Sequence, residues 1–125
     1  MRILLDTNIV LWQLYEIARL SESTKNLMVD AEQVLVSSAT IWEIAIKVRI
    51  GRLKADVDEV MREIEARDLV PLPVLFTHAR RVAELELLHK DPFDRLLIAQ
   101  AVTEGVHLLT ADSQLEQYSD LVICV

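Results

Sequence analysis

The sequence is poor in the residues that cross-link or interrupt a chain. It contains one cysteine, two glycines and three prolines in 125 residues. The single cysteine, Cys124, excludes an internal disulfide, and we interpret it as a buried structural thiol of a protein in the reducing cytoplasm. So few glycines and prolines argue against low-complexity or disordered segments. We therefore expect one folded domain over residues 1–125, because this length is typical of a single core.

Long hydrophobic runs and an excess of positive charge are also missing. No apolar run approaches the roughly 18 residues of a membrane span, and Asp6 interrupts the first run too early for a secretory signal. We therefore expect no membrane association. The net charge of -7 argues against a uniformly basic surface for nucleic acid. Acids that gather around metal ions would be neutralised there, so the distribution of charge matters more than its sum.

Short apolar runs alternate with longer segments of helical period, and 52% of the residues are hydrophobic. The runs predict buried strands at Arg2–Leu5, Val34–Ser37, Leu69–Val74, His107–Thr110 and Leu121–Val125. The periodic segments predict helices at Thr7–Tyr15, Glu22–Ala31, Thr40–Arg49, Val57–Arg67, Thr77–Leu88 and Pro92–Glu104. This alternation predicts an α/β protein with a mainly parallel sheet and helices on both faces.

Several of these boundaries carry a recognisable capping residue. Asp91 before Pro92 predicts a helix N-cap followed by proline in the first turn. Gly105 predicts a left-handed C-terminal cap. Ser21 and Thr77 are the expected N-caps of the helices that follow them.

Four acids lie at functionally suggestive places: Asp6, Glu43, Asp94 and Asp112. Asp6 directly follows the first strand, and Asp112 comes two residues after the strand His107–Thr110. Glu43 and Asp94 lie near helix starts among apolar residues, where a carboxylate is costly to bury without a counter-charge. In a parallel α/β fold the functional crevice lies beyond the carboxyl ends of the strands. We therefore expect the four acids to share divalent cations.

Carboxylates are the ligands that Mg²⁺ prefers, and a pair of ions about 4 Å apart supports phosphodiester cleavage. The three histidines, His78, His89 and His107, are scattered and unpaired in the sequence, which gives no support for zinc.

Each acid also has a purely structural alternative. Asp6 is a possible N-cap of the first helix, and Asp112 of the turn after it. Glu43 is placed to pair with Lys47 at i+4. Asp94 lies at the positive end of its helix. The joint placement of the four favours the metal site over these separate explanations.

At this point the motifs resemble the PIN-domain ribonucleases, in particular the VapC-type toxins of toxin–antitoxin pairs. The matching segments are Leu4–Asn8 (LLDTN), Ser38–Lys47 (SATIWEIAIK), His89–Ala101 (HKDPFDRLLIAQA) and Leu108–Asp112 (LLTAD). They follow the family's order along nearly the whole chain. Many relatives have histidine where Asn8 stands, and Leu115 replaces a phenylalanine often found there.

The resemblance implies a three-layer α/β/α sandwich with a parallel five-stranded sheet, and RNA cleavage that depends on Mg²⁺ or Mn²⁺. It implies that the four acids are the catalytic metal ligands, supported by hydrogen bonds from Thr7, Asn8 and Thr110. It further implies inhibition by a cognate antitoxin protein, and we expect a homodimer.

Basic residues concentrate beyond Glu43, at Lys47, Arg49, Arg52 and Lys54, with no acid before Asp56. This stretch predicts a groove that leads RNA phosphates to the site, and the alternative is a solvated helix end. Trp12 and Trp42 are candidates for stacking on bases, although their apolar helical surroundings favour packing in the core or a dimer.

Other classes of protein fit less well. A phosphoacceptor signalling module needs an acceptor Asp at the end of a middle strand and a late lysine, but Ser37-Ser38 ends that strand and no lysine follows Lys90. A haloacid-dehalogenase-type phosphatase needs an acid where Asn8 stands. A binding module without catalysis does not require all four acids. A PIN-fold nuclease of RNA processing, with no toxin role, remains open.

Overall fold

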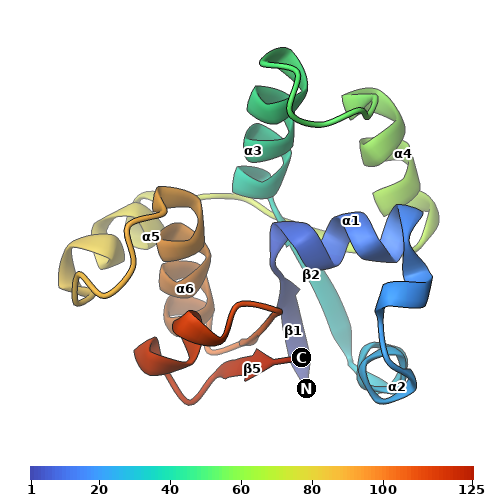
Figure 1. The fold of residues 1–125 in the computed structure, drawn as a ribbon. Coiled ribbons are helices and arrows are strands. Elements are labelled where there is room, and N and C mark those ends of the chain that lie inside the picture. Colours follow the sequence, from blue (N-terminus) through green and yellow to red (C-terminus); the bar gives the residue numbers. More distant parts are fainter.

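A computed structural model describes residues 1–125, which form a five-stranded parallel sheet covered by helices on both faces (Figure 1). The strand order is β3-β2-β1-β4-β5. The strands are β1 (Arg2–Leu5), β2 (Gln33–Ser37), β3 (Val70–Leu72), β4 (His107–Thr110) and β5 (Val122–Cys124). The α-helices are α1 (Thr7–Tyr15), α2 (Glu22–Asp30), α3 (Ser38–Arg49), α4 (Val57–Ala66), α5 (Phe76–Arg81) and α6 (Pro92–Glu104). Short 3₁₀ turns cover Ile17–Arg19, Val82–Glu84 and Ser113–Tyr118.

The sheet separates two hydrophobic cores, because alternate side chains of a strand point to opposite faces. Ile3 and Leu5 pack with α1, α2, α3 and α4, whereas Leu4 packs with α6. Figure 1 shows the same division, with α5 and α6 on one side of the sheet and α1, α3 and α4 on the other. The expected three-layer α/β/α sandwich is confirmed.

Most of the expected elements are present. β1, α1, β4 and α6 have the predicted bounds. Asp91 is the N-cap of α6 and accepts from the backbone N–H groups of Phe93 and Asp94, and Gly105 ends that helix with a left-handed φ of 66°. The side chain of Ser21 accepts from the N–H of Thr24 as the N-cap of α2. These local predictions are confirmed because capping depends on neighbouring residues alone.

The predicted helix Thr77–Leu88 and its cap are wrong. The helix α5 begins after Leu75, and the N–H of Leu75 donates to Nδ1 of His78 at 3.0 Å, so Thr77 is not the cap. The chain leaves helical conformation after Glu84. Carbonyl groups of Val82 and Leu85 accept hydrogen bonds from the guanidinium of Arg95. A helix is therefore replaced by an irregular segment whose carbonyl groups are satisfied by a side chain.

The strand order contains a topological switch point in the middle of the sheet. β1 pairs with β2 on one side and with β4 on the other. The chain reverses its direction of travel across the sheet between these neighbours, which is where parallel α/β proteins bind their ligands. None of the helices combines the length and hydropathy that crossing a bilayer requires.

Candidate metal centre

The carboxyl ends of β1 and β4 bring two of the four acids to the same edge of the sheet. The N–H of Asp6 donates to the carbonyl of Leu109 at 3.0 Å, so β1 and β4 stay paired as far as the site. Asp112 follows β4 after one further residue. The expectation that strand ends would carry the site therefore agrees with the pairing of these strands.

Asp6 is buried with 5% of its surface exposed. Its Oδ1 accepts from the backbone N–H groups of Asn8 at 2.8 Å and Ile9 at 3.4 Å, and its Oδ2 accepts from Oγ1 of Thr110 at 2.5 Å. Burial raises the pKa of Asp6 although these hydrogen bonds lower it, and the nearby charge of Glu43 raises it further. Asp6 caps α1, as the structural alternative proposed, and its charge still has no Lys or Arg partner.

Glu43 lies on α3 with 7% of its surface exposed, and its charge is compensated within the protein. Its Oε2 forms an ion pair with Nζ of Lys47 at 2.7 Å. Its Oε1 accepts from Oγ1 of Thr7 at 2.7 Å, and that hydroxyl lies 3.1 Å from the hydroxyl of Thr40. The expected i+4 pair with Lys47 is present, so both oxygens of Glu43 already have a partner.

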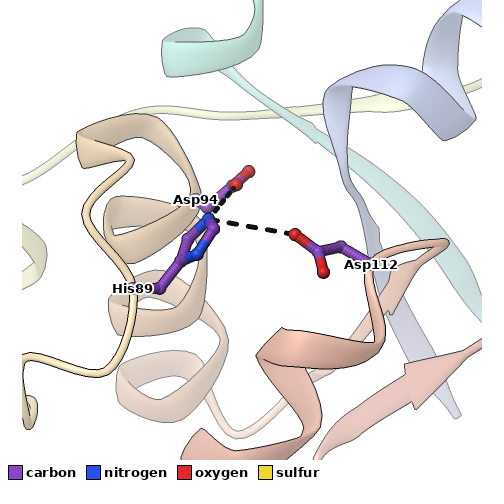
Figure 2. Close-up of side chains that lie close together, drawn as sticks. All are labelled: His89, Asp94 and Asp112. Atoms are coloured by element: carbon purple, nitrogen blue, oxygen red, sulfur yellow. Dashed lines mark hydrogen bonds and ion pairs between the residues drawn. The ribbon is translucent and has the colours of Figure 1, made fainter.

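Asp94 and Asp112 meet at the imidazole of His89. Nε2 of His89 lies 2.9 Å from Oδ2 of Asp94 and 3.8 Å from Oδ2 of Asp112. Figure 2 shows one ring nitrogen of His89 joined to both carboxylates, with Asp94 carried by α6 and Asp112 by the segment after β4. Three donor atoms, one from each residue, lie within 4.8 Å of one another. The two acids of this compact donor set were expected from the sequence, whereas His89 was not.

Ionisation of this group is perturbed by burial and by charge. Burial raises the pKa of Asp94 to about 6, against the hydrogen bond from His89, which lowers it, and the charges of Asp91 and Asp6 raise it further. The hydrogen bond to Asp94 raises the pKa of His89. Asp6 and Asp94 therefore lie close enough to repel each other, although they are far apart in the sequence.

The segment that carries His89 is held by two buried or half-buried side chains. The hydroxyl of Tyr118 accepts from the N–H of His89 at 2.8 Å and from the N–H of Leu88 at 3.1 Å. Arg95 donates to this hydroxyl at 3.1 Å and to the carbonyl of Glu86 at 2.8 Å. Arg95 and Tyr118 were also missed by sequence reasoning. Arg95 follows Asp94 directly, and an arginine in an apolar helical run was the one available signal.

The other expected residues divide into two groups. Thr7 and Thr110 donate to carboxylates as expected, and Thr110 also accepts from the N–H of Asp112 at 3.1 Å. The structure gives no hydrogen bond to the exposed side chain of Asn8. Asp112 also caps the turn after β4, accepting from the N–H of Gln114 at 2.9 Å. Two of the histidines lie beside acids: His89 faces two of them, and Nε2 of His78 lies 3.3 Å from Glu104.

The aspartate carboxylates of this site are suited to bind a hard divalent cation, because no lysine or arginine of the protein neutralises them. Asp6, Asp94 and Asp112 form no ion pair with lysine or arginine, and His89 is the sole positive partner of the last two. Carboxylates that are partly buried without a cation are the usual holders of Mg²⁺ or Mn²⁺. The residues present therefore fit a divalent metal ion.

The basic stretch and the tryptophans differ in their exposure and in their partners. Arg49, Arg52 and Lys54 are exposed and form no ion pair, whereas Lys47 is engaged with Glu43. Trp42 is 61% exposed, so packing in the core is excluded for it, and its ring meets that of Phe93 edge-on at 5.1 Å between centroids. Trp12 is half-buried beneath the guanidinium of Arg19, and it packs on the core as expected.

The chain is similar to known proteins in sequence pattern and in fold. The family model of the PIN domain matches residues 3–121. Among solved structures, VapBC2 from Rickettsia felis bound to a promoter DNA fragment is similar, with TM-score 0.72, 17% identity, and coverage of 100% of this chain and 98% of the other.

Two further structures are similar at comparable coverage. DNA-bound VapBC from Salmonella typhimurium has TM-score 0.70 and 13% identity over 100% of this chain and 97% of the other. FitAcB from Neisseria gonorrhoeae has TM-score 0.66 and 18% identity over 98% and 96%. At such low identity these likenesses concern the fold. No curated protein matches the chain.

Proposed function

The chain belongs to the PIN domain family, and from this membership and the geometry of its site we propose that it is a metal-dependent endoribonuclease that hydrolyses RNA phosphodiester bonds. The strand order also disfavours the phosphoacceptor module, whose sheet has the order 2-1-3-4-5 and not 3-2-1-4-5.

One observation carries the proposal: partly buried carboxylates without a lysine or arginine partner meet at the carboxyl ends of β1 and β4. Asp6, Asp94 and Asp112 share this property. Burial raises the pKa values of Asp6 and Asp94, which means that the folded protein alone stabilises their charged forms poorly. A bound cation would remove this penalty. We propose Asp6, Glu43, Asp94 and Asp112 as the catalytic metal-binding acids.

Divalent ions, Mg²⁺ or Mn²⁺, would supply a Lewis acid for the scissile phosphate and lower the pKa of an attacking water. The protein's own residues set the stage for this chemistry. Thr110 fixes the rotamer of Asp6, and Thr7 fixes that of Glu43. Lys47 pairs with the second oxygen of Glu43 and so holds its carboxylate in place. Asn8 lies exposed beside Asp6, where a polar side chain would meet the substrate.

We propose that RNA reaches the site along the exposed basic C-terminal end of α3 and the residues that follow it. Arg49, Arg52 and Lys54 have no acidic partner, so their charge is available to phosphates. Lys47 was expected to bind RNA as well, but its ammonium group forms an ion pair with Glu43. It would contribute to RNA binding mainly through the local potential.

Two protein partners are proposed as well. Similar structures are toxin–antitoxin complexes, and we propose that this chain is the toxin of such a pair, with a basic side chain of the antitoxin reaching the acidic site.

A homodimer is proposed on the exposed apolar stripe of α3, where Trp42, Ile46 and Ile50 follow one another at i, i+4 and i+8. A role in RNA processing without an antitoxin is the alternative. A short neighbouring reading frame for a DNA-binding protein would favour the toxin.

The nuclease proposal is tested by cleavage of end-labelled RNA. The purified protein is expected to cut RNA with Mg²⁺ or Mn²⁺ and to stop when the ions are chelated. Asp6→Asn is expected to lose cleavage by about a hundredfold or more while its circular dichroism is unchanged, because an electrostatic contact to the transition state is lost. If Asp6→Asn cleaved RNA as fast as the parent with metals present, this site would be abandoned.

A further inference from the structure

The imidazole of His89 has a position that the acidic site alone does not explain. We propose that His89 is itself a metal ligand: when an ion binds, Nε2 releases to solvent the proton that it shares with Asp94, and this nitrogen and the carboxylates of Asp94 and Asp112 hold the ion in a mixed nitrogen–oxygen set. This inference rests on the proposed metal-dependent function and specifies which ion the site prefers.

The first support is the spacing of the donor atoms. In an octahedral site with ligand bonds of about 2.1 Å, neighbouring donors lie about 3 Å apart and opposite donors about 4.2 Å apart. Nε2 of His89 lies 2.9 Å from Oδ2 of Asp94 and 3.8 Å from Oδ2 of Asp112. Both separations are close to this range, and both contacts converge on the same ring nitrogen (Figure 2).

The second support is that the protein holds His89 by its backbone. The segment before α6 has no regular structure, yet its N–H and carbonyl groups are bonded by Tyr118 and Arg95. Arg95 is buried, and its guanidinium donates hydrogen bonds to backbone carbonyl groups at four positions and to the hydroxyl of Tyr118. A surface histidine with no role needs no such support. Fixing a ligand through its surroundings is typical of metal sites.

The consequence concerns metal choice. Carboxylates and water suit Mg²⁺, whereas an imidazole nitrogen favours first-row transition ions. A site with one imidazole and two carboxylates therefore discriminates in favour of Mn²⁺ over Mg²⁺. Removal of the His89 imidazole would reduce the preference for Mn²⁺ over Mg²⁺. Removal of the Asp94 carboxylate would weaken the binding of both ions.

The test is electron spin-echo spectroscopy of the whole protein loaded with Mn²⁺, which detects nitrogen bound to the ion. We expect a directly coordinated ¹⁴N signal that changes to ¹⁵N when histidine is labelled. The signal should vanish in His89→Gln and persist in His107→Gln, a control at the other end of β4. Competition titrations should show Mn²⁺ affinity about tenfold lower in His89→Gln, with a smaller change for Mg²⁺.

Each outcome separates this inference from the function on which it rests. Mn²⁺ that binds through Asp94 and Asp112 without a histidine nitrogen signal would overturn the role of His89 and leave the nuclease proposal standing. A parent protein that binds no Mn²⁺ would overturn both. Because isotope labelling leaves the sequence unchanged, the result does not depend on whether His89→Gln folds.

Discussion

The site has two halves that treat their carboxylates differently. In the glutamate half, made of Asp6, Thr7, Glu43, Lys47 and Thr110, hydroxyl and ammonium groups of the protein occupy the acids. In the histidine half, made of His89, Asp94 and Asp112, the acids face one imidazole and each other. The first half is organised by the sheet and α3, and the second by the loop that Arg95 and Tyr118 secure.

This difference indicates how the work is divided. Glu43 has its charge balanced by Lys47 before any ligand arrives, so its geometry is fixed at little electrostatic cost. The charge of Asp94 is compensated only in part by His89, since burial still raises the pKa of this carboxyl to about 6. The histidine half therefore has the larger free energy to gain from a cation. The predictions below test whether the two halves respond separately.

The largest expected effect is on catalysis. Asp94→Asn should reduce RNA cleavage by about a hundredfold or more, because it removes a carboxylate from the histidine half without changing its size. Asp91→Asn is the matched control three residues away, since asparagine caps a helix as well as aspartate does. Rates measured on one RNA substrate check this. Equal losses in both variants would mean that Asp94 acts only through the start of α6.

The next effect is on stability as a function of pH in the absence of divalent ions. The pKa of Asp94 is higher in the folded state than in the unfolded state, so the protonated carboxyl favours folding. This contribution to the free energy of unfolding is fully present below about pH 4 and is lost as the pH rises through about 6. The raised pKa of His89 extends this loss above pH 6.5. Between pH 4 and 7, the free energy of unfolding of the parent should fall by about 1–2 kcal/mol relative to that of Asp94→Asn, after allowance for the partial exposure of Asp94.

Urea unfolding at several pH values measures that difference. Addition of Mn²⁺ at pH 7 should raise the stability of the parent and leave Asp94→Asn nearly unchanged. A difference between the two proteins that stays constant with pH would contradict the assignment of incompletely compensated charge to the histidine half.

A smaller effect is expected in the glutamate half. Lys47→Met leaves buried Glu43 without its cation and should lower the free energy of unfolding by about 1–2 kcal/mol, since Lys47 is itself partly exposed. The double variant Glu43→Gln, Lys47→Met should recover part of the loss. Lys25→Met is the control, because its pair with exposed Glu22 should contribute almost nothing. Equal destabilisation by both lysine variants would refute the special role of Lys47.

The smallest effect concerns RNA affinity. Arg49→Gln with Arg52→Gln should weaken RNA binding several-fold and reduce the slope of log affinity against log salt by roughly 1–2, as expected for the loss of two phosphate contacts. Arg80→Gln with Arg81→Gln removes the same charge from α5 and serves as the control. Binding that does not change across the salt titration would discard the proposed route.

The sequence predicted what depends on neighbouring residues. The bounds of α6 follow from Asp91, Pro92 and Gly105, which cap and end it locally. The placement of Asp6 and Asp112 at one edge follows from parallel strands. These signals are short in range and survive folding unchanged.

The sequence could not predict what distant residues impose. The segment after Glu84 has a helical pattern, but Arg95 takes its carbonyl groups, and Tyr118 takes the N–H of His89. A single histidine in a loop has no periodicity or spacing that marks it. His89 precedes α6, whereas its partner Asp112 follows β4, so the two residues meet only when the chain is folded.

The most direct test of the central claim is an anomalous difference map from crystals of the protein grown with Mn²⁺. The account predicts a peak within ligand distance of the carboxylates of Asp94 and Asp112, at the carboxyl ends of β1 and β4. A well-ordered site with no peak there, in crystals where Mn²⁺ is bound elsewhere, would contradict the assignment of this edge of the sheet as the metal centre.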